Sequence, residues 1–449
     1  MAVYGRRRVG KTFLIRETFD YKFTFQHSGL AKSTRTKQLR AWRDSLVESG
    51  LKLKFTPTNW LDAFNLLKEL IMKSEDKKKL IFIDELPWMD TNASGLMPAL
   101  EHFWNSWASA RKDVCLIICG SATSWIINKI IKNKGGLYNR VDYKISLPPF
   151  TLNECEQYMR SRKINMSRKQ LIEEYMVMGG PFYWKAVQKG LSLAQNIDQN
   201  FFMPEGELYE EFDALYASLF KKPENYIKIV SILSAKRYGM TRNEIIKNGK
   251  FVDNGGFGQI LKDLESCGFI RSYNMIDKEK KDAIYQLIDP FTIFYYEFIS
   301  NNTRKDPHFW SHSLNTATYH TWCGLSFERV CMLHTEQIKD ALGISGIISG
   351  IISGIYSWRS TKSSPGAQID MLIDRDDDVI NLCEIKYTST PWEMQAKDFQ
   401  DILRKEEVFK FESKTRKTIH NILVSANGVK RNEYSDEIPK IVTADDLFR

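Results

Sequence analysis

A phosphate-binding pattern lies close to the start of the chain. Residues 5–12 read G-R-R-R-V-G-K-T, which matches the Walker A pattern G-x-x-x-x-G-K-[ST]. In such a loop the backbone N–H groups surround phosphate oxygens, Lys11 reaches the β- and γ-phosphates, and Thr12 ligates Mg²⁺. We therefore expect ATP and Mg²⁺ to bind here, on Gly5, Arg6, Arg7, Arg8, Val9, Gly10, Lys11 and Thr12.

Two adjacent acids follow the apolar run Leu-Ile-Phe-Ile at residues 80–83. Carboxylates at the end of a buried strand are costly unless a cation compensates them. We expect Asp84 to hold Mg²⁺, as in a Walker B strand, and Glu85 to polarise the attacking water. The alternative is a structural turn before Pro87.

Two further polar residues follow or precede expected strands. Ser121 comes directly after the apolar run 114–120 and is expected to sense the γ-phosphate or the water, or else to cap the next helix. Arg140 closes the loop 136–140, where a cation would spread transition-state charge. A solvated arginine or a structural ion pair is the alternative for Arg140.

The residues of the expected ATP site can act together only if the fold brings them to one edge of a sheet. Short apolar runs alternate with helical patterns over residues 1–150, which predicts an α/β domain with a parallel sheet. Since ligands bind at the carboxyl ends of parallel strands, the sites above would meet at one edge. A helix is expected over Thr12 to Phe19, and the strands over Met1 to Tyr4, Lys22 to Phe25, Lys79 to Asp84, Val114 to Gly120 and Tyr143 to Leu147.

A second set of charged residues lies near the end of the chain: Glu328, Asp370, Glu384 and Lys386. Asp370 and Glu384 at adjacent strand ends would bind Mg²⁺, and Lys386, on the same strand face as Glu384, would orient water or stabilise a phosphate. The pattern resembles the PD-(D/E)XK nuclease core, and the alternative is a structural domain in which Glu384 and Lys386 are only neighbours. The expected elements are a helix over Gly324 to Leu342 and strands over Ala367 to Ile373, Val379 to Lys386 and Thr418 to Val424.

The middle of the chain is predominantly helical. Residues 151–220 read as helices interrupted at 179–181, a Gly-Gly-Pro turn. From Tyr226, three helical patterns and a hairpin over Arg271 to Ile288 predict a winged-helix module; Thr241 and Glu244 form a capping box, and Gly268 ends the third helix. Contact with DNA is expected mainly from the wing lysines, Lys278, Lys280 and Lys281.

The composition excludes several classes of protein. The 449 residues are 43% hydrophobic and 27% charged, which excludes disordered and collagenous chains. No apolar run long enough to cross a membrane and no signal peptide is apparent, so we expect a cytoplasmic protein. Seven cysteines without a C-x-x-C pair argue against disulfides and a zinc ribbon, and the net charge of +9 is compatible with a polyanionic partner.

Together these motifs resemble a known family. GRRRVGKT, FIDELPW, ICGSATSW, LYNR, GGPFYW and LIDPFTIFYYEF resemble the archaeal-type ATPases of the AAA+/STAND group, whose members commonly carry a C-terminal nuclease-like domain. The resemblance covers nearly the whole chain. Members usually have a segment before the P-loop strand that helps to bind adenine. Only four residues precede Gly5 here, so we expect a truncated start or weaker adenine binding.

The resemblance implies an α/β fold of four parts: a P-loop ATPase core over 1–150, a helical lid over 151–220, a winged helix over 221–300 and a restriction-endonuclease-like domain over 310–449. The first functional hypothesis is an ATP-dependent switch or motor that acts on DNA. The second is a STAND-like signalling ATPase whose winged helix only packs against the ATPase and whose inactive C-terminal domain binds a protein partner. A homo-oligomer is compatible with both hypotheses.

Overall fold

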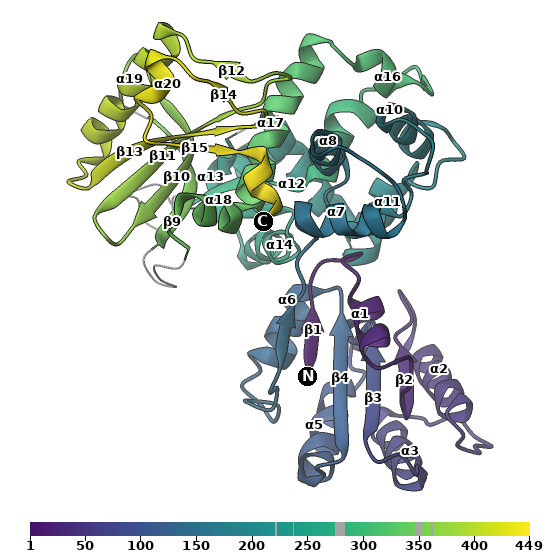
Figure 1. The fold of residues 1–449 in the computed structure, drawn as a ribbon. Helices are drawn as coiled ribbons and strands as arrows, with labels where there is room; N and C mark the ends of the chain where they lie inside the picture. Colours follow the sequence, from purple (N-terminus) through teal and green to yellow (C-terminus); the bar gives the residue numbers. More distant parts are fainter. Residues whose placement is uncertain (221, 237, 274–282, 346–351, 361) are drawn as a thin grey trace. The chain divides into compact units, whose positions relative to one another are not determined.

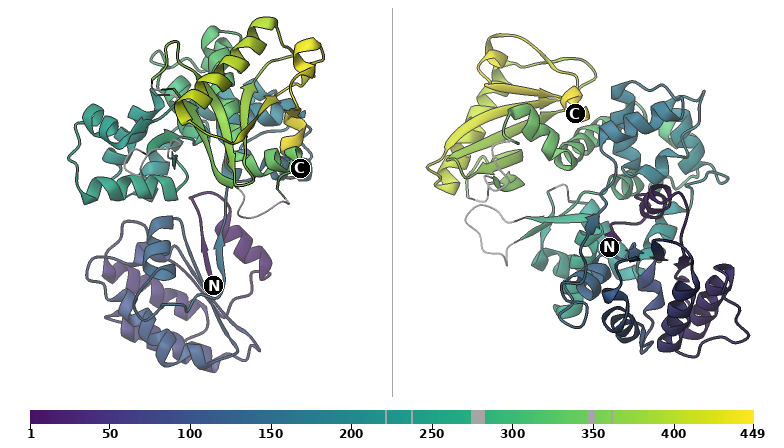
Figure 2. Two further views of the ribbon diagram at one scale, coloured as in Figure 1. Left: turned by 90° about the vertical axis from the view of Figure 1, so that its left-hand side faces the viewer. Right: turned by 60° about the horizontal axis from the view of Figure 1, so that its bottom comes forward.

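The computed structural model describes residues 1–220, 222–236, 238–273, 283–345, 352–360 and 362–449 (Figures 1 and 2). The chain divides into two compact units. Unit 1 contains Met1–Pro149, Asp213–Tyr226 and Gly258–Gly268, and unit 2 contains Phe150–Phe212, Ile227–Phe257 and Phe269–Arg449. The division of the sequence into four parts stays a prediction.

Unit 1 is built on a five-stranded parallel sheet in the order β2-β3-β4-β1-β5. Its register pairs Ser28 with Asp84 and Tyr4 with Gly120. The strands therefore end together, and the loops that follow β1, β3 and β4 meet at one edge. The strands are β1 (Ala2–Tyr4), β2 (Phe25–Ser28), β3 (Lys79–Asp84), β4 (Val114–Gly120) and β5 (Lys144–Ser146).

Helices bury both faces of this sheet. On one face, α2, α3 and α5 contribute Trp42, Phe64 and Leu100 to an apolar core with Phe25. On the other face, Ile15 of α1 packs with Phe82. Burial on both faces explains why the central strands are continuous apolar runs. The helices are α1 (Lys11–Thr18), α2 (Arg35–Glu48), α3 (Trp60–Lys73), α4 (Leu86–Met89), α5 (Leu96–Ser106), η1 (Ala108–Ala110), α6 (Thr123–Ile126) and η2 (Ile127–Ile131).

The predicted bounds of β3 and β4 are confirmed, whereas β2 begins at Phe25 and not at Lys22. The reason is the turn before it. Asp20 and Tyr21 both have positive φ angles, 50° and 58°, and the Thr24 hydroxyl bonds to Asp76. The chain therefore becomes extended three residues later than the sequence pattern predicts.

Residues 150–212 of unit 2 are helical. The predicted interruption is confirmed: α8 ends at Met178, Gly179 has a φ of 62°, and Pro181 begins the next helix. The elements are α7 (Leu152–Ser161), α8 (Arg168–Met178), α9 (Pro181–Trp184), α10 (Leu193–Ile197) and η3 (Asp198–Phe202), followed by α11 (Glu211–Leu219), which crosses the boundary between the units.

The expected winged-helix region contains helices and a small antiparallel sheet, β6-β8-β7. The capping box of Thr241 and Glu244 is confirmed, and Gly268 has a φ of 73° after α14. The three wing lysines lie outside the described residues, so the winged helix stays a prediction. The elements are α12 (Pro223–Ser234), β6 (Met240–Thr241), α13 (Arg242–Gly249), α14 (Gly255–Ser266), β7 (Ile270–Tyr273), β8 (Ile284–Leu287), α15 (Pro290–Phe294), η5 (Tyr295–Ile299) and α16 (Phe309–Ser313).

The C-terminal sheet has the order β15-β13-β11-β10-β9. β9, β10 and β11 are antiparallel, whereas β11, β13 and β15 are parallel, and α19 connects β11 to β13. The elements are β9 (Ile352–Arg359), β10 (Gln368–Arg375), β11 (Val379–Lys386), β12 (Trp392–Glu393), α19 (Ala396–Ser413), β13 (Thr418–Ser425), β14 (Val429–Lys430), α20 (Glu433–Asp436), β15 (Lys440–Thr443) and η6 (Ala444–Phe448).

The single helix expected over Gly324 to Leu342 is wrong. Two helices, α17 (Ala317–Leu333) and α18 (Thr335–Leu342), meet at His334, which leaves the helical region with φ −116° and ψ 35°. The buried ring bonds to Val330 O and accepts from the backbone N–H of Leu152, which fixes the break. Among the described residues, no helix is both long and apolar enough to cross a membrane.

Candidate nucleotide site and a second acidic pocket

The loop between β1 and α1 depends on its two glycines. Gly10 caps α1 with a φ of 89°. Gly5 has a φ of 147°, and a Cβ added there would lie 2.3 Å from the carbonyl oxygen of Leu147. A side chain at Gly5 would therefore force the loop away from the neighbouring strand. Within the loop, Arg6 and Val9 are buried, whereas Arg7 and Arg8 are partly exposed.

The side chain of Lys11 lies inside this loop. Its Nζ donates to Gly5 O over 2.9 Å, to Arg6 O over 2.8 Å and to Ser121 Oγ over 3.2 Å. Burial lowers the pKa of Lys11, and the carboxylates of Asp84 and Glu85 are among the groups that oppose this shift. The ammonium is therefore held among loop carbonyls, at the place where an anion would approach the N-terminus of α1.

The residues expected to hold Mg²⁺ are in contact. Thr12 Oγ1 donates to Asp84 Oδ2 over 2.7 Å, and Asp84 Oδ1 accepts from the backbone N–H of Glu85 over 2.9 Å. A hydroxyl and a carboxylate are hard oxygen donors of the kind that Mg²⁺ prefers. The residues present therefore fit Mg²⁺ bound together with nucleotide phosphates.

Ser121 forms hydrogen bonds with the carboxylate of Glu85. The Ser121 hydroxyl donates to Glu85 Oε1, and the Ser121 N–H donates to Oε2 over 3.1 Å. Glu85 itself has left-handed backbone angles, φ 47° and ψ 42°, which are uncommon for a non-glycine residue and cluster at functional sites. The structure thus brings together Lys11, Glu85 and Ser121, from three different loops.

Arg140 is not part of this cluster. It is exposed in the loop before β5, and none of its side-chain hydrogen bonds or ion pairs within the described residues reaches Lys11, Thr12 or Glu85. Its backbone N–H bonds to Leu137 O, which closes a local turn. The catalytic role of Arg140 stays a prediction.

Sequence reasoning missed Gln38, which connects the loop after β2 to helix α4. This fully buried side chain donates to Leu30 O over 2.6 Å and to Trp88 O over 3.0 Å, and it accepts from the Leu30 N–H. The sequence feature that could have identified Gln38 is its position. It is a polar residue one turn before Trp42, on the apolar face of an amphipathic helix.

Comparison with known proteins agrees with this geometry. Residues 1–181 match the family described as "ATPase domain predominantly from Archaea". This part of the chain is thus similar to an archaeal-type ATPase domain, and its first loop has the phosphate-binding pattern of a P-loop. The chain is 23% identical over 334 residues to an uncharacterised protein of Methanocaldococcus jannaschii, covering 74% of this chain and 71% of that protein.

Two solved structures are also similar to this chain. A Walker-type ATPase of Pyrococcus abyssi is 16% identical with a TM-score of 0.48, over 65% of this chain and 89% of that one. The ADPNP–ADP complex of Aeropyrum pernix ORC2 is 13% identical with a TM-score of 0.39, over 64% of this chain and 83% of that one.

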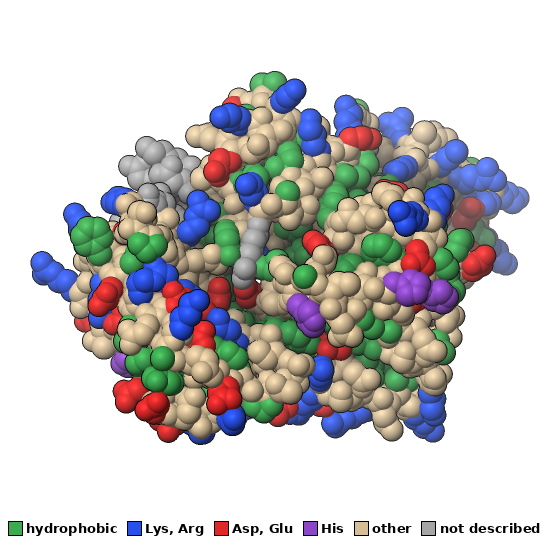
Figure 3. Space-filling view, turned by 90° about the horizontal axis from the view of Figure 1, so that it is seen from above, with side chains coloured by type: hydrophobic (Ala, Val, Ile, Leu, Met, Phe, Trp, Pro, Cys, Tyr) green, Lys and Arg blue, Asp and Glu red, His purple; other side chains and the backbone are tan. Residues whose placement is uncertain are grey.

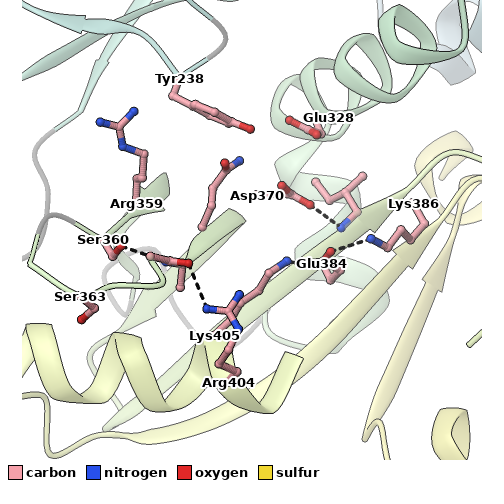
Figure 4. A pocket seen from close by; sticks show the side chains of 14 residues that line it. Tyr238, Glu328, Arg359, Ser360, Ser363, Asp370, Glu384, Lys386, Arg404 and Lys405 are labelled. Atoms are coloured by element: carbon pink, nitrogen blue, oxygen red, sulfur yellow. Dashed lines mark hydrogen bonds and ion pairs between the residues drawn. The ribbon is translucent and has the colours of Figure 1, made fainter. Parts of the chain in front are cut away.

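The second set of predicted residues lines one pocket within unit 2. The cavity measures about 640 Å³, and Figure 4 shows the side chains around it. Glu328 comes from α17, Asp370 from β10, and Glu384 and Lys386 from the end of β11. The structure therefore brings together all four residues that the sequence singled out in this part of the chain.

Glu384 is paired with two lysines. Lys386 Nζ lies 2.7 Å from Oε1, and Lys405 Nζ lies 2.7 Å from Oε2. Lys405 also lies 3.3 Å from Asp401, one turn earlier on α19. Sequence reasoning missed Lys405, because nothing in an exposed-looking Lys-Glu helix pattern shows which residue meets a strand 21 positions away.

Asp370 is buried among acids. Its Oδ2 accepts from the Ile385 N–H over 3.0 Å, while burial and the carboxylates of Glu384 and Glu328 raise its pKa to about 7. The donors have the chemistry that Mg²⁺ prefers, and a cation would relieve their repulsion. Among the described residues, no three His, Cys, Asp or Glu side chains are grouped closely enough to hold a metal ion.

The face drawn in Figure 3 carries both signs of charge. Figure 3 shows lysine and arginine side chains interspersed with aspartate and glutamate over the face in view. The net charge of +9 is therefore not gathered into one basic field on that face.

Proposed function

We propose that the chain is an ATP-hydrolysing switch or motor whose C-terminal α/β part cleaves DNA as a Mg²⁺-dependent phosphodiesterase. The observation that carries the proposal is the pocket in which Glu328, Asp370, Glu384 and Lys386 converge from separate elements. Acids of this kind can hold a divalent cation, and a lysine beside them can stabilise charge that develops on a phosphate.

For ATP hydrolysis, the backbone N–H groups of the loop and Lys11 bind the phosphates. Thr12 and Asp84 would hold Mg²⁺, which would supply positive charge to offset that of the phosphates. Glu85 accepts a proton from the attacking water, and Ser121 orients the Glu85 carboxylate through the bonds to both of its oxygens.

For DNA cleavage, Lys386 lies beside the scissile phosphate and stabilises the charge that develops on its oxygens. Asp370 and Glu384 would hold Mg²⁺, which would lower the pKa of a bound water and offset developing negative charge. Glu328 adds a third carboxylate to the same pocket and orients the attacking water.

Two observations favour the second candidate, a STAND-like signalling ATPase with an inactive C-terminal domain that binds a protein partner. Both oxygens of Glu384 are already paired with lysines. In addition, Cys267, at the end of α14, is buried close enough to Arg6 and Lys11 for their charges to affect its pKa. α14 is the third helix of the expected winged-helix module. If it is held against the nucleotide loop, it is less available to bind DNA.

A plasmid-nicking assay with Mg²⁺ or Mn²⁺ tests the proposal. We expect the parent to nick DNA, and Asp370→Ala to lose nicking while it keeps ATP turnover. The control Asp376→Ala, in the exposed turn after β10, should nick like the parent. A parent that cleaves neither DNA nor RNA, and binds DNA without a steep salt dependence, would contradict the proposal and favour the signalling ATPase.

A further inference from the structure

We propose that Lys405 is an internal counter-ion that must leave Glu384 before a divalent cation binds there, and that a phosphate of the nucleic acid releases it. This inference rests on the proposed phosphodiesterase function. It assigns Lys405 as a positioning residue that couples metal binding to substrate binding.

The distances show that a metal ion would compete with two lysines for the carboxylate of Glu384. Lys386 and Lys405 each lie 2.7 Å from one oxygen of Glu384, so a metal ion would compete with a lysine at either oxygen. Only 11% of the Glu384 side chain and 16% of the Lys405 side chain are exposed, whereas 32% of Lys386 is. The pair of Glu384 and Lys405 is therefore poorly screened by solvent, and Lys405 is the stronger obstacle.

The charges explain why a cation must occupy this place. Asp370 and Glu328 lie in the same pocket as Glu384, and three carboxylates repel one another without a positive charge between them. The Lys405 ammonium lies 2.7 Å from Glu384 and 3.3 Å from Asp401. It therefore supplies part of the positive charge that Mg²⁺ would bring.

The Lys405 ammonium has other groups nearby that it could approach after leaving Glu384. Its flexible stem is within reach of Asp401 on the same helix, and Arg359 and Arg404 line the same pocket. A phosphate attracted by these cations gives the Lys405 ammonium a new partner, which frees one oxygen of Glu384. Because binding linkage is reciprocal, metal and nucleic acid then strengthen each other's binding.

Calorimetric titration of the nucleotide-free full chain with Mn²⁺ tests the inference. The binding that disappears in Asp370→Asn is assigned to this pocket. We expect Lys405→Met to bind Mn²⁺ there roughly tenfold more tightly than the parent, within the usual range of coupling between sites. The control Lys410→Met removes an exposed lysine of α19 that pairs with Glu406, and should leave Mn²⁺ affinity unchanged.

The second arm adds a phosphorothioate oligonucleotide that resists cleavage. It should tighten Mn²⁺ binding to the parent but not to Lys405→Met. If Lys405→Met binds Mn²⁺ no more tightly than the parent, or neither protein binds it, the inference is wrong. If the affinities change as expected while plasmid DNA stays intact, the inference holds and the phosphodiesterase proposal fails.

Discussion

Ser121 holds both carboxylate oxygens of Glu85, one through its hydroxyl and the other through its backbone N–H. The same hydroxyl accepts a hydrogen bond from Lys11. One serine therefore connects the residue proposed to bind phosphate with the residue proposed to activate water.

Ser121→Ala should slow ATP turnover more than it weakens ATP binding. The substitution removes one of the two bonds to Glu85 but leaves the phosphate contacts of the loop intact. We expect kcat to fall roughly tenfold or more, since a misplaced base loses part of the contribution of proton transfer. Steady-state kinetics and nucleotide titration measure the two effects separately. Ser121→Thr keeps the hydroxyl and should retain most activity; equal kcat values for Ser121→Ala and the parent would show that Ser121 does not position Glu85.

Gly5→Ala should disrupt the loop more than Gly10→Ala. Both glycines have positive φ angles, which cost an alanine about 1–3 kcal/mol. Only at Gly5 would the new Cβ also collide with a backbone atom, Leu147 O, whereas nothing lies within 4 Å of a Cβ at Gly10. Thermal unfolding and ATP titration of both variants check this order. A Gly5→Ala protein as stable as Gly10→Ala would contradict it.

Glu174 should make the stability of unit 2 depend on pH. The side chain is fully buried, neither carboxylate oxygen has a hydrogen-bond partner, and burial raises its pKa to about 8. The unfolded chain ionises this group near pH 4.5, so the unfolding free energy should fall as the pH rises towards 8, by up to about 1.4 kcal/mol per pH unit. Glu174→Gln should therefore raise the Tm more at pH 8 than at pH 5.

The exposed residue Glu205 provides the control for this effect. Glu205→Gln should shift the Tm equally at both pH values. A Glu174→Gln protein with the pH dependence of the parent would show that the group ionises without penalty in the folded chain.

The sequence was sufficient to place the strand ends that build both sites. β3 and β11 have the predicted bounds because each is a mostly apolar run with charged residues at or near its carboxyl end. The parallel register then places Glu85 and Ser121 at one edge, as the alternation of strands and helices predicted. Local pattern and tertiary structure agree wherever a strand is buried on both faces.

The sequence was not sufficient for contacts made by helices far along the chain. The helix break at His334 depends on a hydrogen bond from Leu152, 182 residues away, and the pair of Lys405 and Glu384 depends on how α19 packs. Gln38 and Lys405 are ordinary residues in helical patterns until their partners are known. Helix periodicity indicates a face but not which atom that face meets.

ATP binding and turnover by Lys11→Ala and Glu85→Gln test the central claim most directly. Lys11→Ala should lose ATP binding, because the buried ammonium is the proposed phosphate ligand. Glu85→Gln should bind ATP like the parent and lose turnover by roughly a hundredfold or more, because only activation of water is removed. The control Glu69→Gln, on the exposed side of α3, should leave both unchanged. A Glu85→Gln protein that hydrolyses ATP at the rate of the parent would contradict the assignment of the catalytic site.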